Sequence, residues 1–135
     1  MRFVVDTNEI FSFFNEKSKA RKLSLIPGLE LHSPSFSLLE IEEHKSKIIR
    51  GFSLSEAQFQ LVVNLLRTVV KFTGEEEYLK FLPEAKKISP DPDDSDFFAL
   101  ALQLNCPIWS GDKRLKKQPR VKVLSTRDLE DELEL

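Results

Sequence analysis

The chain has 135 residues, a length typical of a single domain that buries its own core. Its 20 basic and 22 acidic side chains leave a net charge of -2, which excludes a nucleic-acid binder that depends on overall positive charge. Its one cysteine, Cys106, cannot form an internal disulfide, and no apolar stretch approaches the roughly 20 residues that span a bilayer, so we expect a cytoplasmic protein without a membrane partner.

The first half of the chain alternates strand-like and helix-like patterns. Residues 2–5 (RFVV) predict a strand, and residues 7–20 follow with apolar side chains at helical spacing. Residues 29–34 (LELHSP) predict a second, weaker strand, and a long helix is expected over residues 35–50. Residues 53–56 (SLSE) match a capping box, which predicts the start of another helix.

The second half continues the alternation. Residues 68–72 (TVVKF) fit either a strand or the end of the preceding helix, and a helix capped by TGEE is expected over residues 73–87. Residues 92–105 predict a further helix that begins at a proline. Residues 107–110 (PIWS) and 121–125 (VKVLS) predict the last two strands, before a terminal helix.

Short strands that alternate with helices are typical of an α/β fold. Parallel strands need helical connections, and these connections cover both faces of the sheet. No internal repeat, low-complexity tract or linker interrupts residues 1–135. The sequence therefore predicts one domain with a central parallel sheet and helices on both sides.

Acidic residues follow two of the predicted strands and head one helix. Asp6 ends the first strand, and Asp112 comes just beyond residues 107–110. Ligands of open parallel sheets bind at the carboxyl ends of the strands, so these two carboxylates are expected in one crevice. Asp94 shares a helical face with Phe97 and Phe98, which need burial, so it points inward at the helix entrance.

Glu40, in the helix over residues 35–50, is a candidate fourth member of this group. Carboxylates so close repel one another unless a cation lies between them, and a hard divalent ion supplies that charge. Ordinary structural roles remain open for the same residues, because acids at helix starts cap the helix and acids after strands serve in turns. Capping is the default interpretation for three neighbouring acids: Asp91, Asp93 and Asp96.

Two stretches resemble the motifs of PIN-domain nucleases. Residues 3–14 (FVVDTNEIFSFF) resemble the opening strand that runs into D-T/S-N, and residues 91–116 (DPDDSDFFALALQLNCPIWSGDKRLK) resemble the distal motif. The resemblance covers essentially the whole chain. It implies a three-layer α/β/α sandwich and a ribonuclease site that uses one or two Mg²⁺ or Mn²⁺ ions.

The resemblance also assigns roles to individual residues. The catalytic and metal-binding acids would be Asp6, Glu40, Asp94 and Asp112. Asp96 is an additional acid near the third position, which could substitute for Asp94 or assist it. Asn8 and Ser110 match small polar positions that support the acids. Such residues would orient the carboxylates or a bound water.

The resemblance further implies partners, because many small stand-alone members are toxins of toxin–antitoxin pairs and homodimers. An RNA substrate, an antitoxin protein and a second copy of the chain are therefore expected. Candidate phosphate contacts follow Asp112 directly: Lys113, Arg114, Lys116 and Lys117, with Arg120 and Lys122 beyond them. Residues 16–22 (EKSKARK) are a second candidate, and either run is also explained as a solvated surface.

Two other functions remain open. The first is a catalytically silent PIN-like module that binds RNA or protein and uses its acids structurally. The second is a carboxylate-metal phosphohydrolase that acts on small molecules, although the sequence has no glycine-rich phosphate loop.

Overall fold

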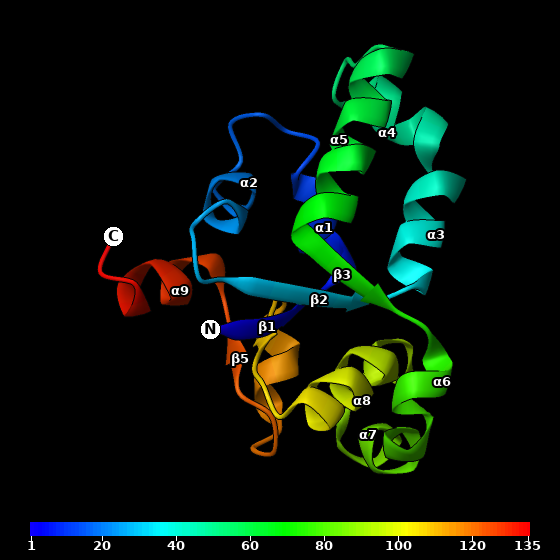
Figure 1. The fold of residues 1–135 in the computed structure, drawn as a ribbon. Helices are drawn as coiled ribbons and strands as arrows, with labels where there is room; N and C mark the ends of the chain where they lie inside the picture. The colour runs from blue at the N-terminus through cyan, green and yellow to red at the C-terminus, as the bar shows by residue number, and fades with distance from the viewer.

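A computed structural model describes residues 1–135 and places five short parallel strands in one sheet (Figure 1). The strands are β1 (Arg2–Val5), β2 (Glu30–Pro34), β3 (Val70–Thr73), β4 (Ile108–Trp109) and β5 (Val123–Leu124). Their spatial order is β3-β2-β1-β4-β5, and β1 pairs with both β2 and β4. The chain moves outward from β1 to β3 on one side and from β4 to β5 on the other, so the order reverses between β1 and β4.

Nine α-helices connect and flank these strands. They are α1 (Thr7–Ser12), α2 (Lys19–Ser24), α3 (Phe36–Glu43), α4 (Lys45–Gly51), α5 (Glu56–Val69), α6 (Glu75–Tyr78), α7 (Leu82–Ile88), α8 (Ser95–Leu104) and α9 (Thr126–Glu132). Three short 3-10 helices complete the secondary structure: η1 (Leu79–Phe81), η2 (Pro92–Asp94) and η3 (Lys113–Lys117).

The core is divided into two clusters by the alternation of side chains along the strands. Phe3, Val5 and Trp109 point to one face of the sheet and pack against α1 to α5 and α9. Val4 and Ile108 point to the other face and pack against α6 to α8. Figure 1 shows α6, α7 and α8 below the sheet and α1 to α5 above it. The predicted three-layer α/β/α sandwich is therefore confirmed.

Two predicted helices are each divided in the structure. The helix expected over residues 7–20 becomes α1 and α2, because Ser18 caps a new helix through its bond from the Arg21 N–H. The helix expected over residues 35–50 is divided at His44, which ends α3 and begins α4.

The start of α5 differs from the predicted capping box. The box is formed by Ser55 and Gln58, each bonding the backbone of the other, rather than by residues 53–56. Ser53 has a φ of 54°, a left-handed backbone conformation in the turn before the helix. Polar residues at both 53 and 55 fit the pattern, and the path of the turn decides between them.

The undecided segment of residues 68–72 is divided between the two alternatives, because Thr68 and Val69 end α5 and β3 begins at Val70. Val70 is buried, and β3 pairs in parallel with β2 along its whole length. The helix expected over residues 73–87 is interrupted, because α6, η1 and α7 follow one another and a proline lies at the start of α7. Gly74 precedes α6 and provides no side-chain cap.

No helix of the structure combines the length and the apolar character that crossing a membrane requires.

Candidate functional site

A cavity of about 220 Å³ lies outside the carboxyl edge of the sheet, where the strand order reverses between β1 and β4. Ligand sites of open α/β sheets occur at this position. Six of the residues that line it carry carboxylates: Asp6, Glu40, Asp91, Asp93, Asp94 and Asp112. The lining also includes one cationic side chain, Arg114, so negative charge is in excess.

Asp6 is the most deeply placed of these acids. It directly follows β1, its side chain is almost fully buried, and its Oδ1 caps α1 by accepting a bond of 2.9 Å from the Glu9 N–H. Its Oδ2 accepts a short hydrogen bond from the Ser110 hydroxyl. Burial raises the pKa of Asp6, and the bond from Ser110 opposes that rise.

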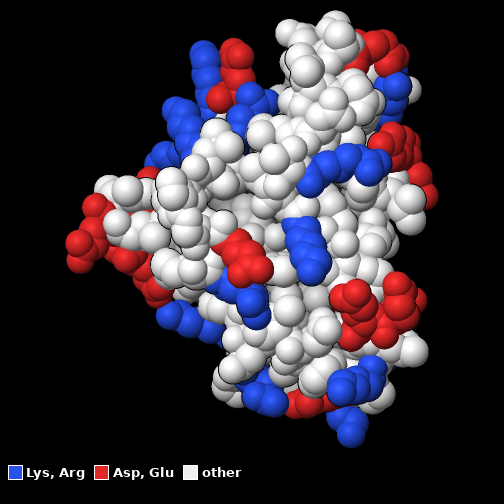
Figure 2. Space-filling view, viewed as in Figure 1, with Lys and Arg blue, Asp and Glu red and all other residues white.

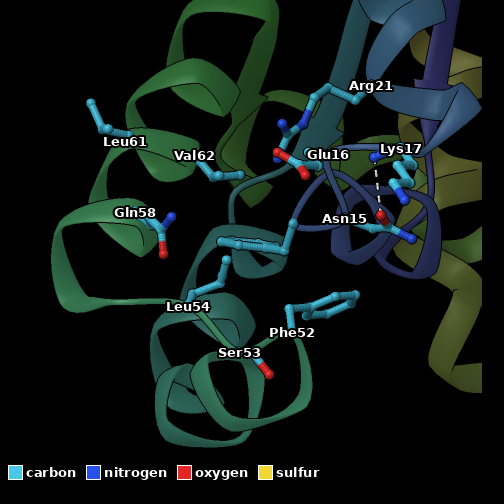
Figure 3. Close-up of a pocket in the computed structure, with 11 residues that line it drawn as sticks. Asn15, Glu16, Lys17, Arg21, Phe52, Ser53, Leu54, Gln58, Leu61 and Val62 are labelled. Atoms are coloured by element: carbon cyan, nitrogen blue, oxygen red, sulfur yellow. Dashed lines mark hydrogen bonds between the residues drawn. The ribbon is translucent and has the colours of Figure 1, made fainter.

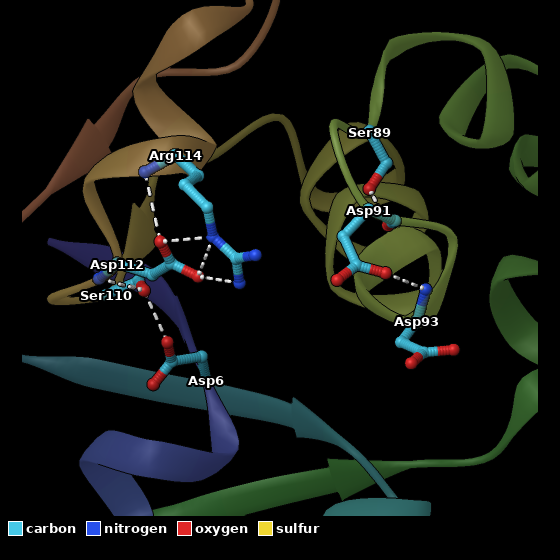
Figure 4. Close-up of polar contacts among 7 residues, drawn as sticks. All are labelled: Asp6, Ser89, Asp91, Asp93, Ser110, Asp112 and Arg114. Atoms are coloured by element: carbon cyan, nitrogen blue, oxygen red, sulfur yellow. Dashed lines mark hydrogen bonds and ion pairs between the residues drawn. The ribbon is translucent and has the colours of Figure 1, made fainter.

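Asp112 lies opposite Asp6, on the turn that follows β4. Its backbone N–H donates to the Ser110 hydroxyl at 3.0 Å, so Ser110 connects the two acids (Figure 4). The Arg114 guanidinium binds the Asp112 carboxylate through Nε at 3.1 Å and Nη2 at 2.8 Å. This pairing lowers the pKa of Asp112 and leaves its carboxylate already neutralised by a cation.

Asp94 stands at the entrance of α8, as the helical pattern predicts. Phe97, Phe98 and Ala101 on the same face are buried, whereas Asp94 is partly exposed toward the cavity. Its pKa is raised to about 6, first by burial and then by the nearby charges of the acids Asp91, Asp112 and Asp6.

Glu40 reaches the cavity from α3 and is partly buried. Burial raises its pKa, and the charge of Glu43 adds to the rise. Asp91 and Asp93 also line the cavity, although the sequence favoured capping for both. Asp91 does cap η2, through a 2.9 Å bond from the Asp93 N–H, and Figure 4 shows both across from Arg114. Asp91 can therefore cap η2 and still belong to the site, because η2 borders the cavity.

The remaining predicted residues occupy different positions. Asn8 lines the cavity, and Ser110 makes the contact with Asp6 expected of a residue that orients a carboxylate. Asp96 does not join the other acids, because it turns away to accept a 2.6 Å bond from the hydroxyl of buried Tyr78. Sequence reasoning did not single out Thr7, Phe36 or Phe97, which also border the cavity.

Comparison with family models gives a match to the PIN domain over residues 4–134. The chain belongs to the PIN-domain family. Its members are nucleases. Among solved structures, this PIN domain resembles VapBC2 from Rickettsia felis bound to a DNA fragment from their promoter, with a TM-score of 0.64 and 16% identity. That likeness covers 93% of this chain and 98% of the other. No curated protein gives a significant match.

The carboxylates that line the acidic cavity fit a hard divalent cation, the kind of ion that PIN nucleases generally use. Carboxylate oxygens are the ligands that Mg²⁺ and Mn²⁺ prefer, and the excess of acids in the cavity calls for positive charge. In the conformation observed, no three His, Cys, Asp or Glu side chains are close enough together to hold an ion. Asp112 is instead bound by Arg114, and Asp6 by Ser110.

The basic run after Asp112 is largely paired with acids. Beyond the pair of Arg114 and Asp112, the ion pairs are Lys116–Asp128, Arg120–Glu84 and Lys122–Glu132. Lys113 and Lys117, at the two ends of η3, make no ion pair, and of the side chains of η3 only Arg114 lines the cavity. On the face in Figure 2, Lys and Arg side chains gather at the upper left, over the loop between α1 and α2, and elsewhere they are interspersed with acids.

A second and larger cavity, of about 520 Å³, lies away from the acids (Figure 3). Phe14, Phe52 and Leu54 contribute apolar surface to it, between the loop after α1 and the turn that joins α4 to α5. Lys17 and Arg21 lie along one side, where Lys17 bonds Asn15 through its backbone N–H.

Proposed function

We propose that this PIN domain is a divalent-metal-dependent endoribonuclease that hydrolyses phosphodiester bonds. The observation that carries the proposal is the meeting of Asp6, Glu40, Asp94 and Asp112 in one cavity at the switch point of the sheet. Four separate segments supply these carboxylates, although their mutual repulsion opposes such an arrangement. A function that needs this negative charge, such as holding a cation, accounts for four carboxylates in one cavity.

Each residue has a defined part in this proposal. Asp6, Asp94 and Asp112 would hold one or two Mg²⁺ or Mn²⁺ ions, with Glu40 assisting. Ser110 would hold the Asp6 carboxylate in place through its short bond, and Asn8 would position water or substrate at the rim. The cation, when bound, would lower the pKa of a coordinated water and stabilise the leaving oxygen.

The substrate contacts would come from η3. Lys113 and Lys117 are unpaired in η3, which directly follows Asp112. Arg114, which lines the cavity, and Lys116 are held by exposed ion pairs, which solvent weakens. Phosphates of a single RNA strand would bind these four side chains, in place of the acids that now neutralise two of them. Because the chain as a whole has a net charge of -2, RNA binding would depend on these four basic side chains.

The test is RNA cleavage in Mn²⁺ or Mg²⁺ by the wild type and by the separate variants Asp6→Asn and Asp94→Asn. We expect each variant to lose at least about a hundredfold in rate, because each removes a charged ligand while keeping the side-chain shape. Asp131→Asn is the matched control, since it removes an exposed acid of α9. Equal rates in all four proteins would reject the catalytic assignment.

A silent PIN-like module is the second candidate, and the pairing of Asp112 with Arg114 favours it. In that module the acids bind guanidinium groups rather than metal. Calorimetric titration of the wild type with Mn²⁺ discriminates between the two, because only the nuclease binds the ion.

We further propose that the domain acts as the toxin of a toxin–antitoxin pair, as the resemblance to small stand-alone PIN proteins implies. The cavity at Phe14 and Phe52 would receive an apolar segment of the antitoxin, and Lys17 and Arg21 would pair with acidic residues beside that segment. A reading frame for a small protein next to this gene, whose product co-purifies with the chain, is the finding that would support this partner.

A further inference from the structure

Glu9 is an acid close to the site that the proposed chemistry does not use. It lies in α1, three residues after Asp6, and is partly buried without lining the acidic cavity. Its backbone N–H binds Asp6 Oδ1, so the same residue touches Asp6 through its main chain. The question is what its carboxylate does behind the site.

The Glu9 carboxylate joins three segments that are distant in the sequence. Its Oε2 accepts a 3.3 Å bond from the Thr126 hydroxyl at the start of α9. Thr126 in turn accepts a 3.0 Å bond from Nε1 of Trp109, the only tryptophan, which lies in β4. A relay therefore runs from β4 through α9 to α1.

The same carboxylate also lies against the turn that carries Asp112. Burial, and after it the charge of Asp6, raise the pKa of Glu9, whereas the Thr126 hydroxyl and the Gly111 backbone N–H favour the charged form. A Cβ added at Gly111 would stand only 3.2 Å from Glu9 Oε1, so the glycine permits this close approach. Gly111 lies between Asp112 and Ser110, the residue that connects Asp112 to Asp6.

We propose that Glu9 is a positioning residue, which fixes the Ser110–Asp112 turn relative to Asp6 and thereby sets the separation of the two carboxylates. The inference rests on the proposed metal-dependent function. A carboxylate suits this role because one oxygen accepts from Thr126 while the other lies against Gly111 of the turn and is available to an N–H there. A glutamine has an NH₂ donor at one of these two positions, so it does not offer an acceptor to both Thr126 and the turn.

The test is calorimetric titration with Mn²⁺ of the wild type and of Glu9→Gln, at a temperature well below both unfolding midpoints. We expect affinity to fall about tenfold in Glu9→Gln, the effect typical of removing a residue that supports a metal ligand. Glu16→Gln is the charge-matched control, because Glu16 is exposed on the loop after α1, and its affinity should stay unchanged.

Thr126→Val separates geometry from charge. It removes the hydroxyl that holds Glu9 but keeps the carboxylate, so Mn²⁺ affinity should fall in the same direction. Its loss and that of Glu9→Gln should not add in the double variant, since both break one relay. If Glu9→Gln fails to fold, the Mn²⁺ affinity of Thr126→Val alone tests the positioning role.

Two results would overturn the inference alone: Mn²⁺ affinity of Glu9→Gln and Thr126→Val equal to that of the wild type, or an equal loss in Glu16→Gln. Failure of the wild type itself to bind Mn²⁺ would reject the metal-dependent function together with this role. The two failures are therefore distinguished in one set of titrations.

Discussion

Asp94 couples the protonation of the site to the stability of the fold. Its pKa is raised to about 6 in the folded chain, from a usual value of 3.8, chiefly by burial. The folded state therefore holds a proton on Asp94 over a pH range in which the unfolded chain has lost it. The stability contributed by this proton is fully present below pH 3.8 and is lost as the pH rises through about 6.

We therefore expect the unfolding midpoint of the metal-free protein to fall as the pH rises from about 5 to about 7. Differential scanning calorimetry across that range, with a chelator present, measures it. Asp94→Asn should show a weaker dependence on pH, because the amide does not titrate. Acids whose pKa is lowered, such as Asp112, lose their contribution only below 3.8 and do not affect this window. A midpoint that rises with pH in the wild type would contradict the assignment.

At the scale of elements, helix α5 is capped by a different serine from the one that the sequence pattern predicts. Ser53 and Ser55 both precede α5, and the sequence pattern SLSE favoured Ser53. Only Ser55 accepts a hydrogen bond from the helix backbone, at 3.0 Å from the Gln58 N–H. The two serines thus form a matched pair for measuring a cap.

Ser55→Ala should lower the free energy of unfolding by about 1 kcal/mol, because an N-terminal N–H of α5 loses its partner. Ser53→Ala should change it by less than about 0.5 kcal/mol, since the Ser53 side chain makes no cap. Urea unfolding followed by circular dichroism measures both variants. A larger loss in Ser53→Ala would restore the start that the sequence pattern predicts.

At the scale of the whole molecule, several exposed apolar side chains lie in the helical region of residues 35–87, which is a candidate face for the expected dimer. They are Leu39, Phe52, Leu61 and Leu79. Phe52 and Leu61 also line the cavity proposed above for the antitoxin, so Leu39 and Leu79 are the candidates for a dimer face. Leu39 is 61% exposed on α3 and Leu79 is 55% exposed on η1. Burying such side chains against a second copy is favourable, because each removes apolar surface from water.

We expect light scattering after gel filtration to give twice the mass of the 135-residue chain. Leu39→Glu should shift the protein toward a monomer, because a charge in an apolar interface is costly to desolvate. The exposed Lys22→Glu, on α2, serves as the control for added negative charge. A monomeric wild type at all concentrations would reject the dimer.

The order of strands and helices could be predicted because it depends on local patterns. Short β-branched runs such as residues 2–5 and the helical face of Phe97 and Phe98 carry their period in the sequence. The positions of Asp6 and Asp112 after strands then placed both at one edge of the sheet. Helix breaks, such as the one at His44, were not predicted, because apolar spacing continues through residues 35–50 and His44 is neither a proline nor a glycine.

The sequence by itself thus determined the parallel α/β architecture, the family motifs and the acids that end the strands. Only the tertiary structure decided which polar groups meet. Asp96 pairs with Tyr78 and Arg114 with Asp112, whereas Glu9 reaches Thr126 across 117 positions of the chain. The physical reason is that a side chain's partner depends on the direction in which its element presents it. That direction follows from how the layers pack, which no local pattern encodes.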